Sequence, residues 1–201
     1  MPLIIAIILT FLTLNFQHIA NIVPKVPTLS DYLPTPTPPP QKIIVPKTNP
    51  DSSPWGVAKK IGEHTYQIQV QNDSQMGSAA EILQALNDLR TRSGAQLLAS
   101  DPRLCQYAKD RADYFVTIKS TDAHAGFIDF LDNHDGFRFL GYGQVGENSS
   151  YGYVLSGVHL IEWVYNSDTE HSQNQLDPKW DRACVGVSSP ATDLIFATSP
   201  L

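Results

Sequence analysis

Three side chains of this 201-residue sequence are of types that can bind a metal ion or move a proton: His124, Glu147 and His171. Imidazoles exchange protons near neutral pH and ligate divalent metals together with carboxylates. Asn148, directly after Glu147, adds an amide, which we expect to order the turn there. Three interpretations stay open: a hydrogen-bonded cluster that braces a groove, a ligand or metal site with zinc as the expected ion, and a hydrolytic site.

A hydrolytic site needs an activated nucleophile, and the sequence offers none in a recognisable setting. Ser149, Ser150 and Ser167 lie close in sequence to the three residues, but they occupy no elbow or triad motif. Enzymatic activity is therefore not the favoured interpretation.

The elements that must position these side chains are helices followed by late strands. Ser78 and Glu81 form a capping box, which predicts a helix that Gly94 ends. A second helix is expected from Asp101, with Pro102 in its first turn. A strand, a third amphipathic helix containing Trp163 and two further strands are expected at residues 65–70, 156–164, 183–187 and 194–197. This order predicts an α+β fold with an antiparallel sheet, in which Trp163 lies in the core or the groove wall.

The N-terminus differs from the rest of the chain. Residues 1–23 contain the apolar run Leu3–Phe16, shorter than the roughly 20 residues that a spanning helix needs. No basic residue precedes the run, and His18-Ile19-Ala20 is a poor cleavage site, so we favour a membrane anchor over a cleaved signal peptide. Residues 24–54 form a proline-rich linker, expected to act as a semi-rigid spacer. Residues 55–201 remain for a folded domain.

Composition narrows the class of protein. The net charge is −6, and the sequence has no basic patch with interleaved aromatic residues. Both observations argue against nucleic acid as a partner. The two cysteines, Cys105 and Cys184, are compatible with a disulfide in an exported protein or with two buried thiols. Neither has the spacing of a thiolate zinc site.

Residues 78–198 resemble the CAP superfamily, the SCP fold shared by venom allergens and plant pathogenesis-related proteins. Leu86-Asn87-Asp88-Leu89-Arg90 is similar to the Leu-Asn-x-x-Arg signature of bacterial members. The elements that follow it in family order are His124, Gly146-Glu147-Asn148, Trp163, His171 with Asn174-x-Leu176-x-Pro178, and Val185-Gly186-Val187.

The resemblance implies an α/β/α sandwich with a groove lined by two histidines and two acidic residues. His124, Glu147 and His171 match three of these positions, whereas Asn166 stands where eukaryotic members carry the second acid. We therefore expect an extracytoplasmic domain, membrane-anchored or secreted, that acts as a binding module for a cell-envelope component, a lipid or a protein. The alternative is a metal-dependent hydrolase or peptidase that uses the same three residues.

Overall fold

The computed structural model describes residues 54–199. The expected anchor at 1–23 and all but the last residue of the expected linker at 24–54 lie outside the described residues and stay predictions. Among the helices of residues 54–199, none is long and apolar enough to cross a membrane.

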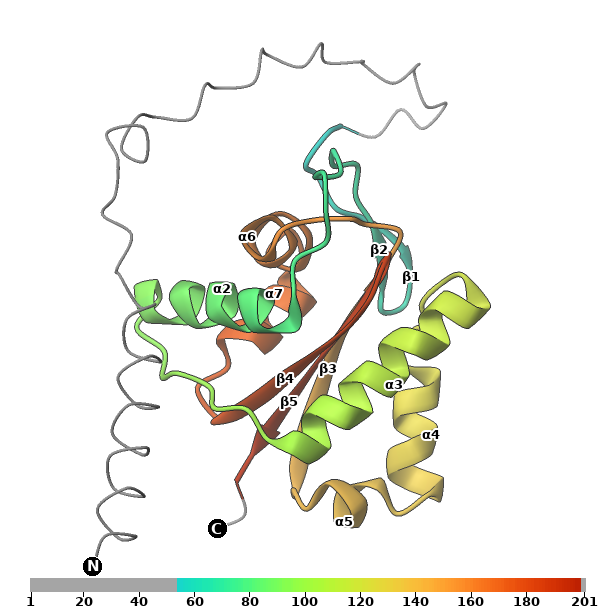
Figure 1. Ribbon diagram of the computed structural model, residues 1–201, viewed down its shortest axis with the longest axis vertical. Helices are drawn as coiled ribbons and strands as arrows, with labels where there is room; N and C mark the ends of the chain where they lie inside the picture. The colour runs from blue at the N-terminus through green and yellow to red at the C-terminus, as the bar shows by residue number, and fades with distance from the viewer. Residues whose placement is uncertain (1–53, 200–201) are drawn as a thin grey trace, which may run out of the picture. The chain divides into compact units, whose positions relative to one another are not determined.

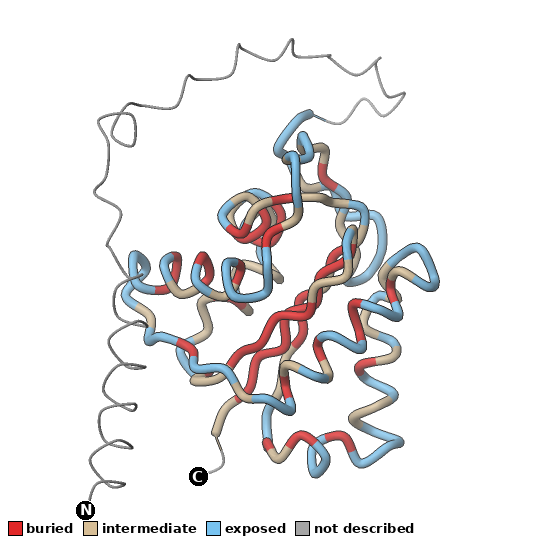
Figure 2. Tube along the Cα trace, in the orientation of Figure 1, coloured by how far each residue is buried: buried red, intermediate tan, exposed pale blue. Residues whose placement is uncertain are grey.

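The centre of the fold is a three-stranded antiparallel sheet of order β3-β5-β4. Its strands are β3 (Gln144–Tyr151), β4 (Arg182–Ser188) and β5 (Ala191–Thr198). The central strand β5 is buried along all but its last residue, as expected for a strand paired on both edges and covered on both faces (Figures 1 and 2).

Helices cover both faces of the sheet. Because successive strand residues point to opposite faces, Leu194 and Phe196 pack on the side of α2 (Ala79–Arg92), while Ile195 and Ala197 pack on the side of α3 (Pro102–Ile118). Figure 1 shows the sheet running between these helices, with α4 (Ala125–Asn133) beside α3. The arrangement confirms the expected mixture of helices and a small antiparallel sheet.

Gly186 explains how closely α3 lies against β4. A Cβ atom at this position would stand 1.9 Å from the carbonyl oxygen of Ala108, so any other residue would push the helix off the strand. Cys105 of α3 and Cys184 of β4 form a disulfide across the same contact. The structure therefore resolves the question that the sequence left open between a disulfide and two thiols.

Smaller elements surround the sandwich. A separate hairpin of β1 (Lys59–Gly62) and β2 (Thr65–Gln67) precedes α2, so the strand expected at 65–70 is shorter than predicted. The helix expected at 156–164 is a short α6 (Gly157–His159) that continues as a π-helical turn, η2 (Leu160–Tyr165). Two further helices are α5 (Gly136–Leu140) and α7 (Thr169–Leu176).

Half of the predicted capping box forms. The Ser78 hydroxyl accepts a hydrogen bond from the Glu81 amide at 3.2 Å. The Glu81 carboxylate does not return to Ser78; it accepts from the amide of Gly157 at 2.9 Å. An amide at the start of a helix lacks an intrahelical partner, so the tertiary bond satisfies a donor that would otherwise be unpaired. Glu81 thus joins two helices instead of closing its own.

The Leu-Asn-x-x-Arg signature is structural. The Asn87 amide donates to the carbonyl of Leu98 and accepts from the Leu98 amide, at 3.0 and 2.8 Å. The fully buried Arg90 guanidinium donates to four backbone carbonyls, those of Gln96, Gln175, Asp177 and Trp180. Both side chains therefore replace missing backbone partners in the segments around α2.

Candidate functional site

A buried guanidinium, that of Arg111, binds two carboxylates that position the candidate site. Arg111 of α3 donates two hydrogen bonds of 2.8 Å to Asp122 and one of 2.8 Å to Glu147. Burial alone lowers the pKa of Arg111, but the bonds to the two carboxylates raise it above its ordinary value. Burial likewise raises the pKa of Asp122, and Arg111 outweighs that effect and lowers it. Arg111 and Asp122 are thus held in their charged forms.

Glu147 connects Arg111 to the first histidine, His124. Its side chain is fully buried on β3, and Oε2 accepts a hydrogen bond from Nδ1 of His124 at 2.7 Å. Ala123 and His124 both have positive φ, at 53° and 68°. Asp122 holds this turn by accepting from the Gly126 amide at 2.9 Å. Left-handed backbone at two non-glycine residues persists only where such contacts fix it, and here it orients the imidazole.

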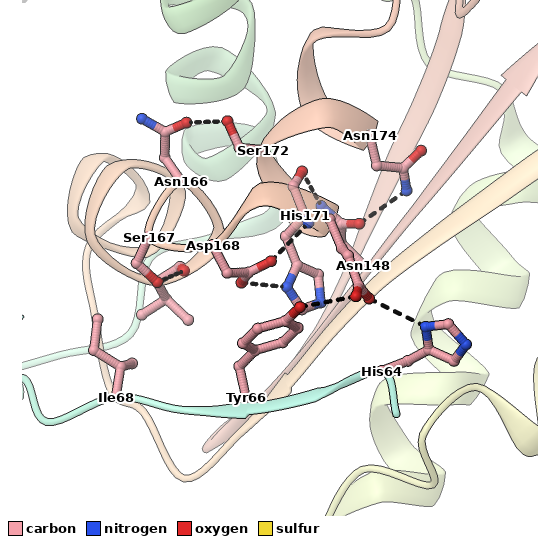
Figure 3. A network of polar contacts seen from close by, with 12 residues as sticks. His64, Tyr66, Ile68, Asn148, Asn166, Ser167, Asp168, His171, Ser172 and Asn174 are labelled. Carbon is pink, nitrogen blue, oxygen red and sulfur yellow. Dashed lines mark hydrogen bonds and ion pairs between the residues drawn. The ribbon is translucent and has the colours of Figure 1, made fainter. Parts of the chain in front are cut away.

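His171 is held in a similar way by a different carboxylate. Asp168 accepts from the backbone amide of His171 at 2.9 Å, which caps α7, and also from its Nδ1 at 2.6 Å (Figure 3). Tyr66 and Tyr165 flank the ring, with centroids 5.9 and 5.7 Å away. One short capping motif therefore both starts the helix and fixes the imidazole.

The two imidazoles line one groove of about 450 Å³. Their ring centroids are 6.5 Å apart. A carboxylate only accepts hydrogen bonds, so each neutral ring donates from Nδ1 and leaves an acceptor lone pair on Nε2. No described residue forms a hydrogen bond with either Nε2 atom. The groove is otherwise lined mainly by hydroxyls and aromatic rings, among them Tyr66, Ser120, Thr121, Ser149, Tyr153 and Tyr165.

Glu147 and Asn148 support the groove without lining it. Both are buried in β3, so the turn expected after Glu147 is wrong. Asn148 donates to the carbonyl of His171 at 3.1 Å and accepts from Asn174 at 2.8 Å. The amide therefore ties β3 to α7, and with them the two sides of the groove.

The predicted metal set is only partly assembled. His124 and His171 share the groove, but the carboxylate of Glu147 is already engaged by Arg111 and His124. Within residues 54–199, no group of three or more histidine, cysteine or acidic side chains lies in a position to hold a metal ion. Two imidazoles with carboxylates behind them do fit the ligand shell of zinc, so zinc binding stays a prediction.

A third histidine lies at the groove, and no local sequence pattern predicts it. His64, in the tip of the β1–β2 hairpin, lies with its ring centroid 6.3 Å from that of His124. Glu170 of α7 accepts from Lys60, His64 and Tyr66 at 2.8, 3.1 and 2.8 Å. These three bonds lower the pKa of Glu170 to about 2. The partners are more than 100 residues apart, so local patterns do not predict the contact.

A buried acid without a partner lies beneath the same region. Asp193 of β5 is fully buried, and neither of its carboxyl oxygens has a hydrogen-bond partner in the structure. Burial, and then the charge of Glu147, raise the pKa of Asp193 well above its ordinary value. Burial therefore favours the neutral form of this acid more than it would be favoured in an exposed aspartate.

Two residues expected near the groove face elsewhere. Asn166 does not line it; its side chain accepts from Ser172 at 2.7 Å (Figure 3). Trp163, expected in the core or the groove wall, is 43% exposed and lines a different pocket. The irregular turn of η2 changes which side chains face inward, so α-helical periodicity misplaces them.

The family model of the cysteine-rich secretory proteins, CAP, matches residues 83–194, more than half of the chain. The chain belongs to this family. Among curated proteins, none matches it.

One solved structure supports the fold, and two more distant ones are similar over part of the chain. An extracellular protein with an SCP domain from Bacillus anthracis str. Ames is 18% identical, with a TM-score of 0.52, and the match covers 60% of this chain and 40% of that one. A cysteine-rich secretory protein of Staphylococcus aureus subsp. aureus Mu50 is also 18% identical, with a TM-score of 0.49 over 67% and 41% of the two chains. An outer surface protein of Borrelia burgdorferi is 13% identical, with a TM-score of 0.47 over 62% and 100%. The match thus spans well under half of the first two proteins.

Proposed function

We propose that this chain is an extracytoplasmic binding module whose groove holds a polar ligand on the imidazoles of His124 and His171. The proposal rests on the hydrogen bonding of the two imidazole rings. Each is fixed at Nδ1 by a carboxylate, and each leaves Nε2 without a protein partner in the described residues. A pre-organised acceptor pair favours a ligand that offers hydrogen-bond donors, or a divalent cation.

The size and lining of the groove support a small ligand or the polar end of a larger one. About 450 Å³ lies within the range of small-molecule sites. Hydroxyl-bearing side chains predominate over aliphatic ones, which favours a polar group of a cell-envelope component or of a protein over a lipid tail.

Hydrolysis is the second candidate, and the hydroxyls argue against it. The Ser150 hydroxyl bonds to Thr192 at 2.6 Å, and the Ser167 hydroxyl donates to the carbonyl of Val164 at 2.6 Å. In the described part of the chain, no serine or threonine hydroxyl bonds to either groove histidine. A hydrolase would therefore have to use a metal-bound water between the imidazoles, with no protein nucleophile.

Export from the cytoplasm is supported by three independent features. The sequence begins with an apolar segment, the Cys105–Cys184 disulfide suits an oxidising compartment, and the matched Bacillus anthracis protein is described as extracellular. We propose that residues 1–23 anchor the domain in the membrane and that residues 24–54 act as the spacer.

Zinc is the sharpest probe of the groove. Titration of the full chain with zinc, followed by calorimetry and by the imidazole proton resonances, should give one site that perturbs His124 and His171. A His124→Ala, His171→Ala double variant should weaken binding at least about tenfold, a change of about 1.4 kcal/mol. His134→Ala is the matched control, since the His134 imidazole is exposed and bonds to Asp129, away from the groove. If the double variant binds zinc as tightly as the parent, or if the parent binds none, the two Nε2 atoms are not available to a ligand and the proposal is wrong.

The hydrolase candidate has its own test. A panel of peptide and ester substrates is incubated with the zinc-loaded chain and with the double variant. Turnover in the parent alone would establish catalysis and displace the binding module as the primary function. Equal background in both proteins supports the binding module.

A further inference from the structure

A second pocket lies on the other side of η2 from the groove. We define the outer pocket as the hollow of about 570 Å³ lined by Trp55, Gln71, Glu162, Trp163 and Asn166, with Ser167 shared between it and the groove. Five of the residues that line it lie outside the part of the chain that the family model matches: Trp55, Gly56, Gln69, Val70 and Gln71. The outer pocket is thus a feature that membership of the family does not explain.

Two exposed indoles dominate the outer pocket. Trp55 is 63% exposed and Trp163 is 43% exposed, whereas the third tryptophan of the chain, Trp180, is buried. Leaving two large aromatic rings in water is unfavourable for folding, and grouped exposed aromatics mark binding surfaces. The same indoles are the natural contact surface of a ligand.

The indole of Trp163 and the backbone of Trp55 are held in place by neighbouring residues. Trp163 stacks on His159 with ring centroids 3.5 Å apart and an interplanar angle of 12°. His159 is fixed in turn by Asp73, which it contacts at 2.8 and 3.0 Å. Trp55 is tied through a β-bridge to Gln69, and the next residue, Gly56, donates to the Gln69 carbonyl at 2.9 Å. Rigid aromatic rings lose little entropy on binding.

The polar groups of the outer pocket are uncharged or neutralised. Gln71 and Asn166 are exposed amides, each with donors and an acceptor, and Asn166 uses its oxygen on Ser172 and keeps its amide hydrogens. Glu162 pairs with Arg92. The pocket therefore combines two flat aromatic faces with neutral hydrogen-bonding groups.

We propose that the outer pocket binds a neutral glycan chain. A pyranose ring has an apolar face of C–H groups, which suits the negative face of an indole, and a rim of hydroxyls that both donate and accept. The net charge of −6 disfavours acidic polymers. The proline-rich stretch of this chain at 33–40 fits less well, because proline has no amide hydrogen and leaves the acceptors of the pocket unmatched.

The test uses the full chain and defined probes. The β-1,4-linked tetramers of N-acetylglucosamine and of glucose are titrated separately, with tryptophan fluorescence and calorimetry as readouts. We expect saturable binding of at least one tetramer with Kd on the order of 0.1 mM. The buried Trp180 should keep its emission while the exposed indoles change theirs.

Variants locate the binding. Trp55→Ala and Trp163→Ala should each weaken binding at least about tenfold, and Asn166→Ala a few fold, because stacking contributes more than one exposed hydrogen bond. Phe139→Ala is the matched control, an exposed aromatic of α5. His124→Ala should leave glycan binding unchanged, which separates this site from the groove.

Three results would overturn the proposal. The first is no binding of either tetramer at about 10 mM, a Kd too weak for a specific site. The second is binding that survives both tryptophan substitutions. The third is saturation of the outer pocket by a peptide of residues 33–40 when neither tetramer binds, which would assign the pocket to proline-rich segments.

Discussion

The groove and the outer pocket share Ser167 and are built on opposite principles. In the groove, the rings of His124 and His171 are positioned by carboxylates, and one of these, Glu147, is paired with a buried guanidinium. In the outer pocket, the indoles are positioned by local stacking and a β-bridge at the surface. The geometry of the groove is therefore coupled to folding of the whole sandwich, while that of the outer pocket depends on a few exposed residues. Substitutions should separate the two regions by their effect on stability.

Arg111→Met gives the largest expected effect. It removes the partner of two buried carboxylates, and breaking a buried ion pair in this way costs about 3–5 kcal/mol. The free energy of unfolding in urea is the measurement. Lys109→Met on the same helix removes only the exposed pair with Asp113 and should cost less than about 1 kcal/mol. Similar losses of unfolding free energy in the two variants would contradict a stabilising role of the Arg111 ion pairs beneath the groove.

Asp193→Asn is expected to stabilise the protein. The raised pKa means that the folded state binds the proton of Asp193 more tightly than the unfolded state does. The contribution of this group to stability is therefore fully present below pH 3.8, its ordinary pKa, and is lost as pH rises toward the folded pKa. The amide is neutral throughout, which should add about 1–3 kcal/mol at pH 8 and little at pH 4. Thermal unfolding at both pH values measures the gain. An equal gain at both would show that ionisation is not the cause.

Trp163→Ala should have a small effect on folding. Loss of the stack on His159 costs about 1 kcal/mol, since the indole is already half exposed. The imidazole resonances of His124 and His171 are expected to stay in place. If they move as far as they do in Arg111→Met, the two regions are coupled and the contrast between them fails.

Glu170→Gln should have the smallest effect on global stability, below about 1 kcal/mol, because Glu170 is part-exposed. Its effect is local: amide hydrogen exchange in the β1–β2 hairpin should speed up. The depressed pKa means that the contacts of the carboxylate stabilise the hairpin above pH 4.5 and are lost as pH falls toward about 2. At pH 2 the parent should exchange like the variant. Glu63→Gln, on the exposed tip of the same hairpin, is the control.

Local patterns predicted the parts of the fold that depend on local physics. The serine cap and the Asp101-Pro102 start placed α2 and α3 within a residue or two, because capping is decided within one turn. Two short apolar runs bounded by turn residues predicted β4 and β5. The strand that carries Glu147 was missed, since Gly146-Glu147-Asn148 has neither β-branched residues nor an apolar alternation.

The candidate site was predictable in its residues and not in its bonds. The order of motifs predicted that His124 and His171 share a groove, and both line the same hollow in the structure. That this hollow is a binding site stays a prediction. The roles of Arg111, Asp122 and Asp168 depend on contacts that only the folded chain creates, apart from the cap at Asp168, three residues before His171. His64 was not predicted at the groove, because its contact with Glu170 spans about half the chain. Trp163 was misplaced, because a π-helical turn changes which face of the helix it occupies.

The disulfide between α3 and β4 has a consequence for how the domain responds to proteolysis. Arg111, Asp122, His124, Glu147, Asp168 and His171 all lie between Cys105 and Cys184, in a covalent ring that the bond closes over a separation of 79 residues. A protease that cuts once in this ring, for example at the exposed His134–Asp135 turn, leaves two fragments still joined by the sulfurs. The nicked domain would run as two bands on a gel only after reduction. Until then its histidines, and the carboxylates that hold them, stay on one molecule.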